Sequence, residues 1–394
     1  MPFANSSDGS FQAPSHLPSD YVELVILSIV LIVGTPLNVT ALSKLLPAYL
    51  SVQQVDLKCG FNLLKIHLTV ANLVIIVGYC PSKIGWLISY KWLGGDFFCR
   101  AIQFCWLFSF HLSSFVVVCI AIDRLRTVAR LASIAKGHSR RLIISGADNV
   151  LGPIKRSLIF AYLAAVLCSV PQWAVWGTID LESSGDWSQC ATIWHRQRVI
   201  DFLDGRPEQS EYFWEQVYQL GHLVTVFWAP FLVICVAYGC IVVRLLEYSI
   251  RPYTAVPRTL NEQSVIEQSV NANTDHMQLG RGRAAYGATN NVQEERKMEL
   301  LEAPSMPYDR PRKQSISPGQ VPTWRLQMRS RMFRTTAYVL LAYAVFWLPY
   351  NAIALAMFVD NQVQIFVSEH LAVLRCLILF NAVLNPFIYG LSNV

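Results

Sequence analysis

Long apolar runs alternate with short polar segments along this chain, and each run holds only a few polar side chains. A helix rises about 1.5 Å per residue, so it needs about 20 apolar residues to cross the hydrocarbon of a bilayer. The run that starts at Cys99 meets this length and ends in Asp123-Arg124, followed by further positive charge. The pattern predicts seven membrane-spanning helices, at about Tyr21 to Leu46, Phe61 to Trp86, Cys99 to Arg130, Pro153 to Trp176, Tyr212 to Glu247, Gln327 to Phe358 and Ser368 to Leu391.

The composition agrees with a membrane protein. Hydrophobic residues make up 53% of the 394 residues and charged residues only 15%, with a mean hydropathy of +0.36. Soluble domains carry about 25% charged residues, so repeated apolar runs at this charge content predict an all-α protein that crosses the membrane several times. The formal charge of +6 therefore says little about nucleic acid. We expect membrane lipids around the chain and no nucleic-acid partner.

Lysine and arginine are unevenly distributed between the connections, and this predicts the orientation. They are dense between Arg124 and Arg156 and between Arg244 and Arg334, whereas residues 1–43 contain none. Because cytoplasmic loops carry the excess of positive charge, we expect an extracellular N-terminus and a cytoplasmic C-terminus. The first residues show neither a basic head nor an apolar stretch, so we expect the first span to act as an uncleaved signal.

These expectations divide the chain into four parts. They are an extracellular segment at residues 1–20, spans one to five with their loops at 21–247, a third cytoplasmic loop at 248–324, and spans six and seven at 325–394. The third loop is rich in Asn, Gln, Ser, Pro and charge, cannot build a core and is expected to be disordered. Within it, Arg312-Lys313-Gln314-Ser315 fits a basophilic kinase site at Ser315, although such short motifs also occur by chance.

Cysteines and asparagines bear on metal binding and modification. The ten cysteines form no Cys-x-x-Cys pair, so we expect no metal site and no cofactor. Only Cys99 and Cys190 fall in expected extracellular segments outside a helix interior. Asn5-Ser6-Ser7 fits a glycan acceptor, whereas Asn38, which also has the pattern, lies within the first span.

Polar side chains within the spans are the residues that can carry chemistry. A polar group in hydrocarbon is costly unless it is paired, so these residues should face one another across the bundle. Taken singly, each is explained as a structural hydrogen-bonding group. The set comprises Asn38, Asn72, Ser113, Asp123, Arg124, Tyr238, Trp347, Tyr350, Asn381, Asn385 and Tyr389.

As a set on successive spans, these residues resemble those of the rhodopsin-like (class A) G-protein-coupled receptors. The third span ends in DRL at 123–125, the sixth contains FWLPY at 346–350, and the seventh contains NPFIY at 385–389. Pro230 and Tyr238 keep the spacing of the fifth span. The resemblance covers all seven spans and implies a multi-pass receptor of the plasma membrane that is not an enzyme.

The resemblance also implies residue roles. Cys99 and Cys190 would form a disulfide that ties the second outer loop over the third span. Arg124 would be the switch residue, held by Asp123 at rest and free to meet a heterotrimeric G protein when the sixth span swings outward.

Further roles follow for the sixth and seventh spans. Tyr238 and Tyr389 would approach Arg124 during the swing. Pro349 and Pro386 weaken the hydrogen-bond ladders of their helices and would supply the hinges. Trp347 would be the packing switch below the pocket, although a large core aromatic explains it as well.

A narrower match lies in the second span, where LLKIHLTVANLVI at 63–75 is similar to the gonadotropin-releasing-hormone receptors and their adipokinetic-hormone relatives. Residues 187–190, 171–172 and 349–350 agree with that group. Family habit then implies the q-class G protein, phospholipase C and calcium. The end at Val394 is similar to that of tail-less members, which predicts slow internalisation whether this end is native or shortened.

Three positions depart from the superfamily pattern. Asn72 stands where most members carry Asp, and Asn385 is neutral too, so we expect no allosteric sodium site. Arg329 stands near the inner end of the sixth span, where many relatives carry an acid that pairs with Arg124. We therefore expect appreciable basal signalling unless Asp123 alone holds Arg124. The usual tryptophan of the fourth span is replaced by residues 160–162, Phe-Ala-Tyr.

The ligand should enter the bundle, because residues 1–20 are too few for a hormone-capturing domain. Amine receptors need an acid where Gln103 and Trp106 stand, and retinal needs a lysine at the level of Leu379, so both ligands are set aside. A short peptide suits the site best, since amide side chains fit backbone groups and aromatic rings provide buried area. The candidate pocket residues are Lys83, Trp86, Gln103, Trp106, Gln172, Gln219, His222, Trp347, Tyr350, Asn351 and Glu369.

Charge at two pocket positions differs from the resembled group, which carries an acid at Lys83 and a lysine at Trp106. We therefore expect a neutral or acidic-ended peptide. For each pocket residue alone a structural role fits equally well, and His222 fits best as a core histidine. A lipid or other small non-peptide ligand stays open. A transporter would need an acid at a span centre, and an enzyme would need a nucleophile beside a base; neither is present in the sequence.

Overall fold

The structure is a computed structural model, and it describes residues 16–51, 57–135, 148–181, 187–206, 213–250, 323–358 and 371–390. The glycan acceptor Asn5, the kinase site Ser315 and the pocket candidate Glu369 lie outside the described residues, as do the side chains of Arg329 and Tyr389. The chain divides into two compact units, residues 1–250 with 327–394, and residues 251–326. The fold below concerns the first unit.

Helices form at all seven predicted spans, which confirms the all-α bundle. The elements are α1 (Pro18–Ser51); α2 (Leu57–Val74), η1 (Ile75–Tyr79) and α3 (Cys80–Ser89); α4 (Gly95–Ala135); α6 (Asp148–Ser169) and α7 (Gln172–Val175); α9 (Phe213–Leu223), η3 (Val224–Trp228) and α10 (Ala229–Ile250); α12 (Thr323–Ala356); and α14 (Leu371–Gly390). Among the described residues, five helical stretches are long and apolar enough to cross a membrane, and 341–356 and 373–388 are shorter apolar stretches.

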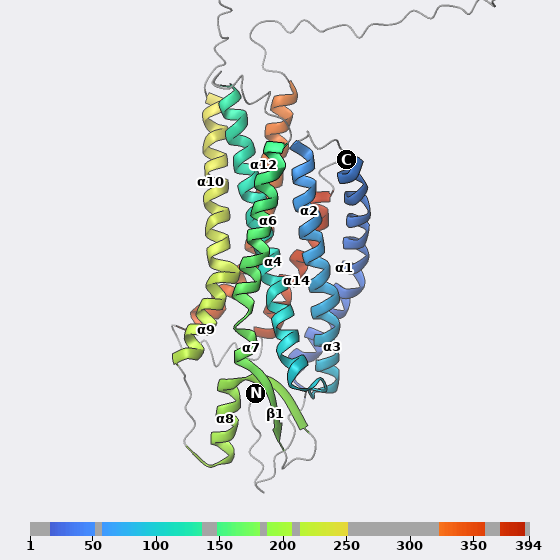
Figure 1. Cartoon of the computed structure of the whole chain (residues 1–394), viewed down its shortest axis with the longest axis vertical. Helices are drawn as coiled ribbons and strands as arrows, with labels where there is room; N and C mark the ends of the chain where they lie inside the picture. Colours follow the sequence, from blue (N-terminus) through green and yellow to red (C-terminus); the bar gives the residue numbers. More distant parts are fainter. Residues whose placement is uncertain are drawn as a thin grey trace, which may run out of the picture. The chain divides into compact units, whose positions relative to one another are not determined.

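The long helices run side by side, and α4 lies in the middle of them (Figure 1). It packs against α2, α6 and α10, while α1 packs against α2 and α14. Large apolar side chains point outward from the bundle; Ile32 is 71% exposed, Phe160 73% and Leu167 72%. Such exposure would be unfavourable in water but suits contact with lipid tails.

Two of the spans contain a π-helical turn directly before a proline. η1 ends two residues before Pro81, and η3 ends two residues before Pro230. A proline ring clashes with the carbonyl of the preceding turn and supplies no N–H, and a wider turn accommodates both effects. The sequence places Pro230 inside the fifth span but does not predict the π-helical turn before it.

The connection after α7, which the sequence predicts only as the second outer loop, contains a β-hairpin. Strands β1 (Trp176–Leu181) and β2 (Trp187–Thr192) pair antiparallel, with Thr178 opposite Cys190, and α8 (Ile193–Leu203) follows. The disulfide Cys99–Cys190 is present, with 5.5 Å between the Cα atoms. It fixes β2 to the start of α4, as the resemblance implies.

Two hydrogen bonds attach the hairpin to residues in α4 and just before it. The Trp92 N–H donates to the Ser188 carbonyl over 2.8 Å, and the Thr178 N–H donates to Asp96 Oδ1 over 3.0 Å. The hairpin is therefore attached at several points around the disulfide. We call this part of the bundle the disulfide end, and the part that holds Asp123 and Arg124 the Arg124 end.

Candidate functional site

Asparagines tie α1, α2 and α14 together at mid-bundle. Asn38 Nδ2 donates to the Gly34 carbonyl over 2.9 Å and to the Ala382 carbonyl over 3.1 Å. Asn385 Nδ2 donates to Asn72 Oδ1 over 3.4 Å. The other two predicted polar-core residues, Ser113 and Asn381, are buried as well.

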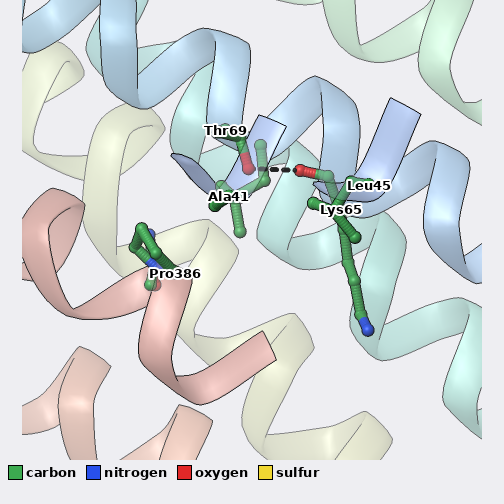
Figure 2. Close-up of a pocket in the computed structure, with 7 residues that line it drawn as sticks. Ala41, Leu45, Lys65, Thr69 and Pro386 are labelled. Atoms are coloured by element: carbon green, nitrogen blue, oxygen red, sulfur yellow. Dashed lines mark hydrogen bonds between the residues drawn. The ribbon is translucent and has the colours of Figure 1, made fainter. Parts of the chain in front are cut away.

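A small cavity lies beside this polar centre, between α1, α2 and α14 (Figure 2). Its volume is about 10 Å³, which is room for about one water molecule. Thr69 Oγ1 donates to the Lys65 carbonyl at its wall over 2.8 Å. Figure 2 shows the Lys65 side chain extending away from Pro386, so its ammonium does not reach into the cavity. The cavity is too small for an organic ligand.

Arg124 is held by contacts that the sequence predicts only in part. Its Nη2 lies 4.0 Å from Asp123 Oδ2, as expected. Its guanidinium carbon also lies 3.3 Å from the ring centre of Phe61, and Lys65 Nζ lies 4.2 Å from the same centre. Tyr238 is only 2% exposed and lies within electrostatic range of Arg124. A cation over an aromatic face is favoured by about 0.5–2 kcal/mol, so Phe61 adds a second restraint.

Phe61 and Lys65 are missing from the predicted site residues. The Lys65 side chain is 1% exposed, and its ammonium has no hydrogen-bond partner among the described residues. A lysine inside the apolar stretch 61–76 was a visible signal, because ionisable residues within spans are functional candidates by default. No comparable signal distinguishes Phe61 from the other apolar residues of its span.

Tryptophans line the inner side of the disulfide end. Trp86 Nε1 donates to Gln189 Oε1 over 2.8 Å, and Gln189 Nε2 donates to the Tyr90 carbonyl over 2.8 Å. Trp106 Nε1 donates to Ser82 Oγ over 3.0 Å. The rings of Trp86 and Trp106 are 6.2 Å apart. The structure thus brings these two predicted pocket residues together under the hairpin.

Aromatic contacts continue from Trp106 toward the middle of the bundle. Tyr79 lies 4.8 Å from Trp106 and 5.6 Å from Phe110, and Phe110 lies 6.4 Å from Trp347. Trp347 then stacks on Tyr343 at 5.2 Å. The predicted packing switch is therefore connected to the disulfide end through ring contacts.

A charged group joins α1, α3 and α14 at the disulfide end. Lys83 Nζ lies 4.0 Å from Glu23 Oε1, and Glu23 is only 2% exposed. Lys83 Nζ also lies 5.0 Å from the ring centre of Trp86. The guanidinium carbon of Arg375 lies 5.6 Å from the ring centre of Tyr350. Glu23 and Arg375 were not among the predicted pocket residues.

The sequence held a signal for both. Glu23 and Arg375 are ionisable residues inside the first and seventh apolar runs, which is a reason to suspect function. Glu23 balances the charge of Lys83, so the positive charge noted there in the sequence is not isolated.

The remaining pocket candidates divide into two groups. Gln103 and Gln172 are buried, and Gln103 Nε2 lies 4.0 Å from Cys190 Sγ. Gln219 is exposed and donates to Glu215 Oε1 over 3.4 Å, and Asn351 Nδ2 donates to the Trp347 carbonyl over 2.8 Å. The last two amides are used within their own helices.

His222 is part of a pair that the sequence did not predict. Its ring lies 5.9 Å from the ring of His111. His111 Nδ1 donates to the Leu107 carbonyl over 3.1 Å, and His111 Nε2 lies 3.1 Å from Thr225 Oγ1. The two histidines link α4 to α9 and η3.

Comparison with known proteins finds a family that matches most of this chain. The family model described as "7 transmembrane receptor (rhodopsin family)" matches residues 43–389. The G-protein coupled receptor daf-38 of Caenorhabditis elegans is 29% identical over 96% of this chain and 90% of its own length. The gonadotropin-releasing hormone receptor of Trichosurus vulpecula is 26% identical over 45% of this chain and 52% of its own length. That of Sus scrofa is 30% identical over 35% and 40%, respectively.

Proposed function

Because the chain belongs to the rhodopsin family of seven-transmembrane receptors, we propose that it binds a short extracellular peptide at the disulfide end and activates a q-class G protein at the Arg124 end. Membership makes the chain a multi-pass plasma-membrane protein that signals through G proteins. The family is a class of receptors rather than of enzymes. Beyond family membership, we propose that the ligand is a peptide, that the G protein is of the q class and that the disulfide end lies outside the cell.

The ring contacts between Trp106 and Trp347 are the observation that carries this proposal. They join the disulfide end to α12, the helix whose outward swing the family resemblance implies. Packed side chains have few alternative arrangements, so a ligand that displaces Trp106 would have to shift the rings below it. A ligand acts in this way only if it binds the shifted arrangement more tightly than the resting one.

The chemistry at the disulfide end supports a peptide. Aromatic rings offer buried area, and Gln103 and Gln172 offer amide groups for backbone hydrogen bonds. The similarity of residues in this chain to gonadotropin-releasing hormone receptors supports the same ligand class. Positive charge concentrated after the first, third and fifth spans supports the orientation.

A small apolar ligand, such as a lipid, is the second candidate. The direct packing of Trp86 on Trp92 at 5.5 Å and on Trp106 at 6.2 Å makes the site largely aromatic. Such a lining suits an apolar ligand with one polar group.

The test is a screen of the full chain in cells, with secreted peptides in one panel and lipids in the other. Calcium release and G-protein dissociation are read at matched surface expression. A peptide should raise both signals, and Arg124→Gln should abolish them without loss of surface protein. Activation by lipids alone would refute the peptide ligand, and undiminished G-protein dissociation in Arg124→Gln would refute the switch.

A further inference from the structure

Arg375 lies near the beginning of α14 and is exposed, whereas Glu23 and Tyr79, which lie within its electrostatic range, are buried. Its guanidinium interacts with the side chain of Tyr350 on α12, 5.6 Å from the ring centre. Among the described residues, no carboxylate lies within 4.0 Å of this guanidinium. The arginine therefore has an aromatic neighbour but no close anionic one in this part of the chain.

Two acids of α1, Glu23 and Asp20, lie within electrostatic range of Lys83. Glu23 lies within electrostatic range of Arg375, but its carboxylate lies 4.0 Å from Lys83. Asp20, one turn earlier on α1, accepts the Leu17 N–H over 2.8 Å at the start of its helix. The Glu23 carboxylate lies closer to Lys83 than to Arg375, so Arg375 has no carboxylate within ion-pair distance among the described residues.

Because Arg375 is exposed, its guanidinium is accessible to an incoming anion, and the ring of Tyr350 borders it on one side. Guanidinium is planar and presents paired N–H donors that match a carboxylate in a bidentate arrangement. The guanidinium carries one positive charge, which one carboxylate matches. A phosphate monoester carries about −1.5 to −2 at neutral pH and would leave charge uncompensated.

Resting on the proposed receptor function, we infer that the activating ligand carries a carboxylate that binds Arg375 beside Tyr350, with Lys83 and Glu23 as its charged neighbours. Two sources share this chemistry: the free C-terminus of a peptide and the head group of a fatty acid. The position also suits signalling. Tyr350 and Trp347 are three residues apart and so lie on one side of α12, and an anion that draws Arg375 away from Tyr350 changes the packing next to Trp347.

The test uses matched pairs of probes on the full chain. One set is a library of tetrapeptides, each made as the free acid and as the C-terminal amide. The other set is medium- and long-chain fatty acids, each with its methyl ester. G-protein dissociation is measured in the wild-type protein, Arg375→Gln, Arg375→Lys and Arg206→Gln. Arg206 is the control, because it is an exposed arginine already paired with Asp204 at 2.7 Å.

In the wild type, an acid probe should act at a concentration about 10-fold or more below its neutral partner, since a hydrogen-bonded ion pair adds about 1.5–3 kcal/mol. Arg375→Gln should remove this preference, Arg375→Lys should keep part of it, and Arg206→Gln should keep all of it. A variant counts as folded if its surface expression and its response to the neutral probes equal those of the wild type.

The outcomes separate this inference from the proposed function. Amides or esters that act as well as the acids, or an acid preference unchanged in Arg375→Gln, would overturn the carboxylate site while leaving the receptor intact. A preference for fatty acids over their esters, with silent peptides, would support the carboxylate site and refute the peptide ligand. Absence of any acid that outperforms its neutral partner would overturn the inference.

Discussion

The hydrogen bond between Ser114 on α4 and Tyr343 on α12 offers a sharp test of how the bundle is held at rest. The two oxygens are 2.8 Å apart and buried. Ser114 Oγ also donates to the Val226 carbonyl over 2.8 Å, so its single proton is used there and the Tyr343 hydroxyl is the donor in the pair. Tyr343→Phe therefore removes one interhelical hydrogen bond and leaves the Ser114–Val226 bond intact.

The size of the effect follows from what the substitution leaves unchanged. The ring of Tyr343 stacks on Phe227 at 5.4 Å and on Trp347 at 5.2 Å, and phenylalanine keeps both contacts. A neutral buried hydrogen bond contributes about 0.5–1.5 kcal/mol. If α12 moves away from α4 on activation, loss of the Ser114–Tyr343 hydrogen bond shifts the balance between resting and active states by about two- to twelve-fold toward the active state.

The assay is ligand-free G-protein dissociation at several surface densities. Tyr343→Phe should raise basal activity per receptor, and Tyr338→Phe is the matched control, because Tyr338 lies on the same helix and is 56% exposed. In the double variant Ser114→Ala, Tyr343→Phe, the Ser114–Tyr343 bond should contribute little further change in basal activity, because Tyr343→Phe alone already removes it. Basal activity that is unchanged or lower in Tyr343→Phe, with normal surface protein, would refute the restraint between α4 and α12.

Three further predictions concern other contacts. Cys99→Ser opens a loop with a sequence separation of 91, for which chain entropy gives about 4.6 kcal/mol as an upper value; surface expression should fall sharply, and normal expression and thermal stability would contradict a structural role. Glu23→Gln should lower the melting temperature of the solubilised receptor by leaving Lys83 unpaired, and adding Lys83→Gln should recover part of the loss; a double variant less stable than both single variants would contradict the pairing. Phe61→Leu removes the ring beside Arg124, worth about 0.5–2 kcal/mol, and should raise basal signalling; a fall at equal surface density would count against this restraint.

The spans were predictable from local sequence, and the pairing of Cys99 with Cys190 from the family resemblance. A bilayer offers no water to backbone groups, so each span must be a helix of a minimum apolar length. That requirement acts within one segment, which is why the runs near Cys99 and Pro230 are readable without a structure. The π-helical turns and the β-hairpin were missed, because hydropathy does not distinguish an α turn from a wider one and a short strand pair carries little periodic signal.

The sequence by itself determined which residues share a helix and that polar groups such as Asn38 and Asn72 must find partners. Only the tertiary structure decided the partners: Glu23 for Lys83, Phe61 for Arg124, and Tyr350 for Arg375. Each pair joins residues of two different helices. The rotation of a helix about its own axis is set by packing against all of its neighbours, and spacing along one helix contains no information about which neighbour a side chain will face.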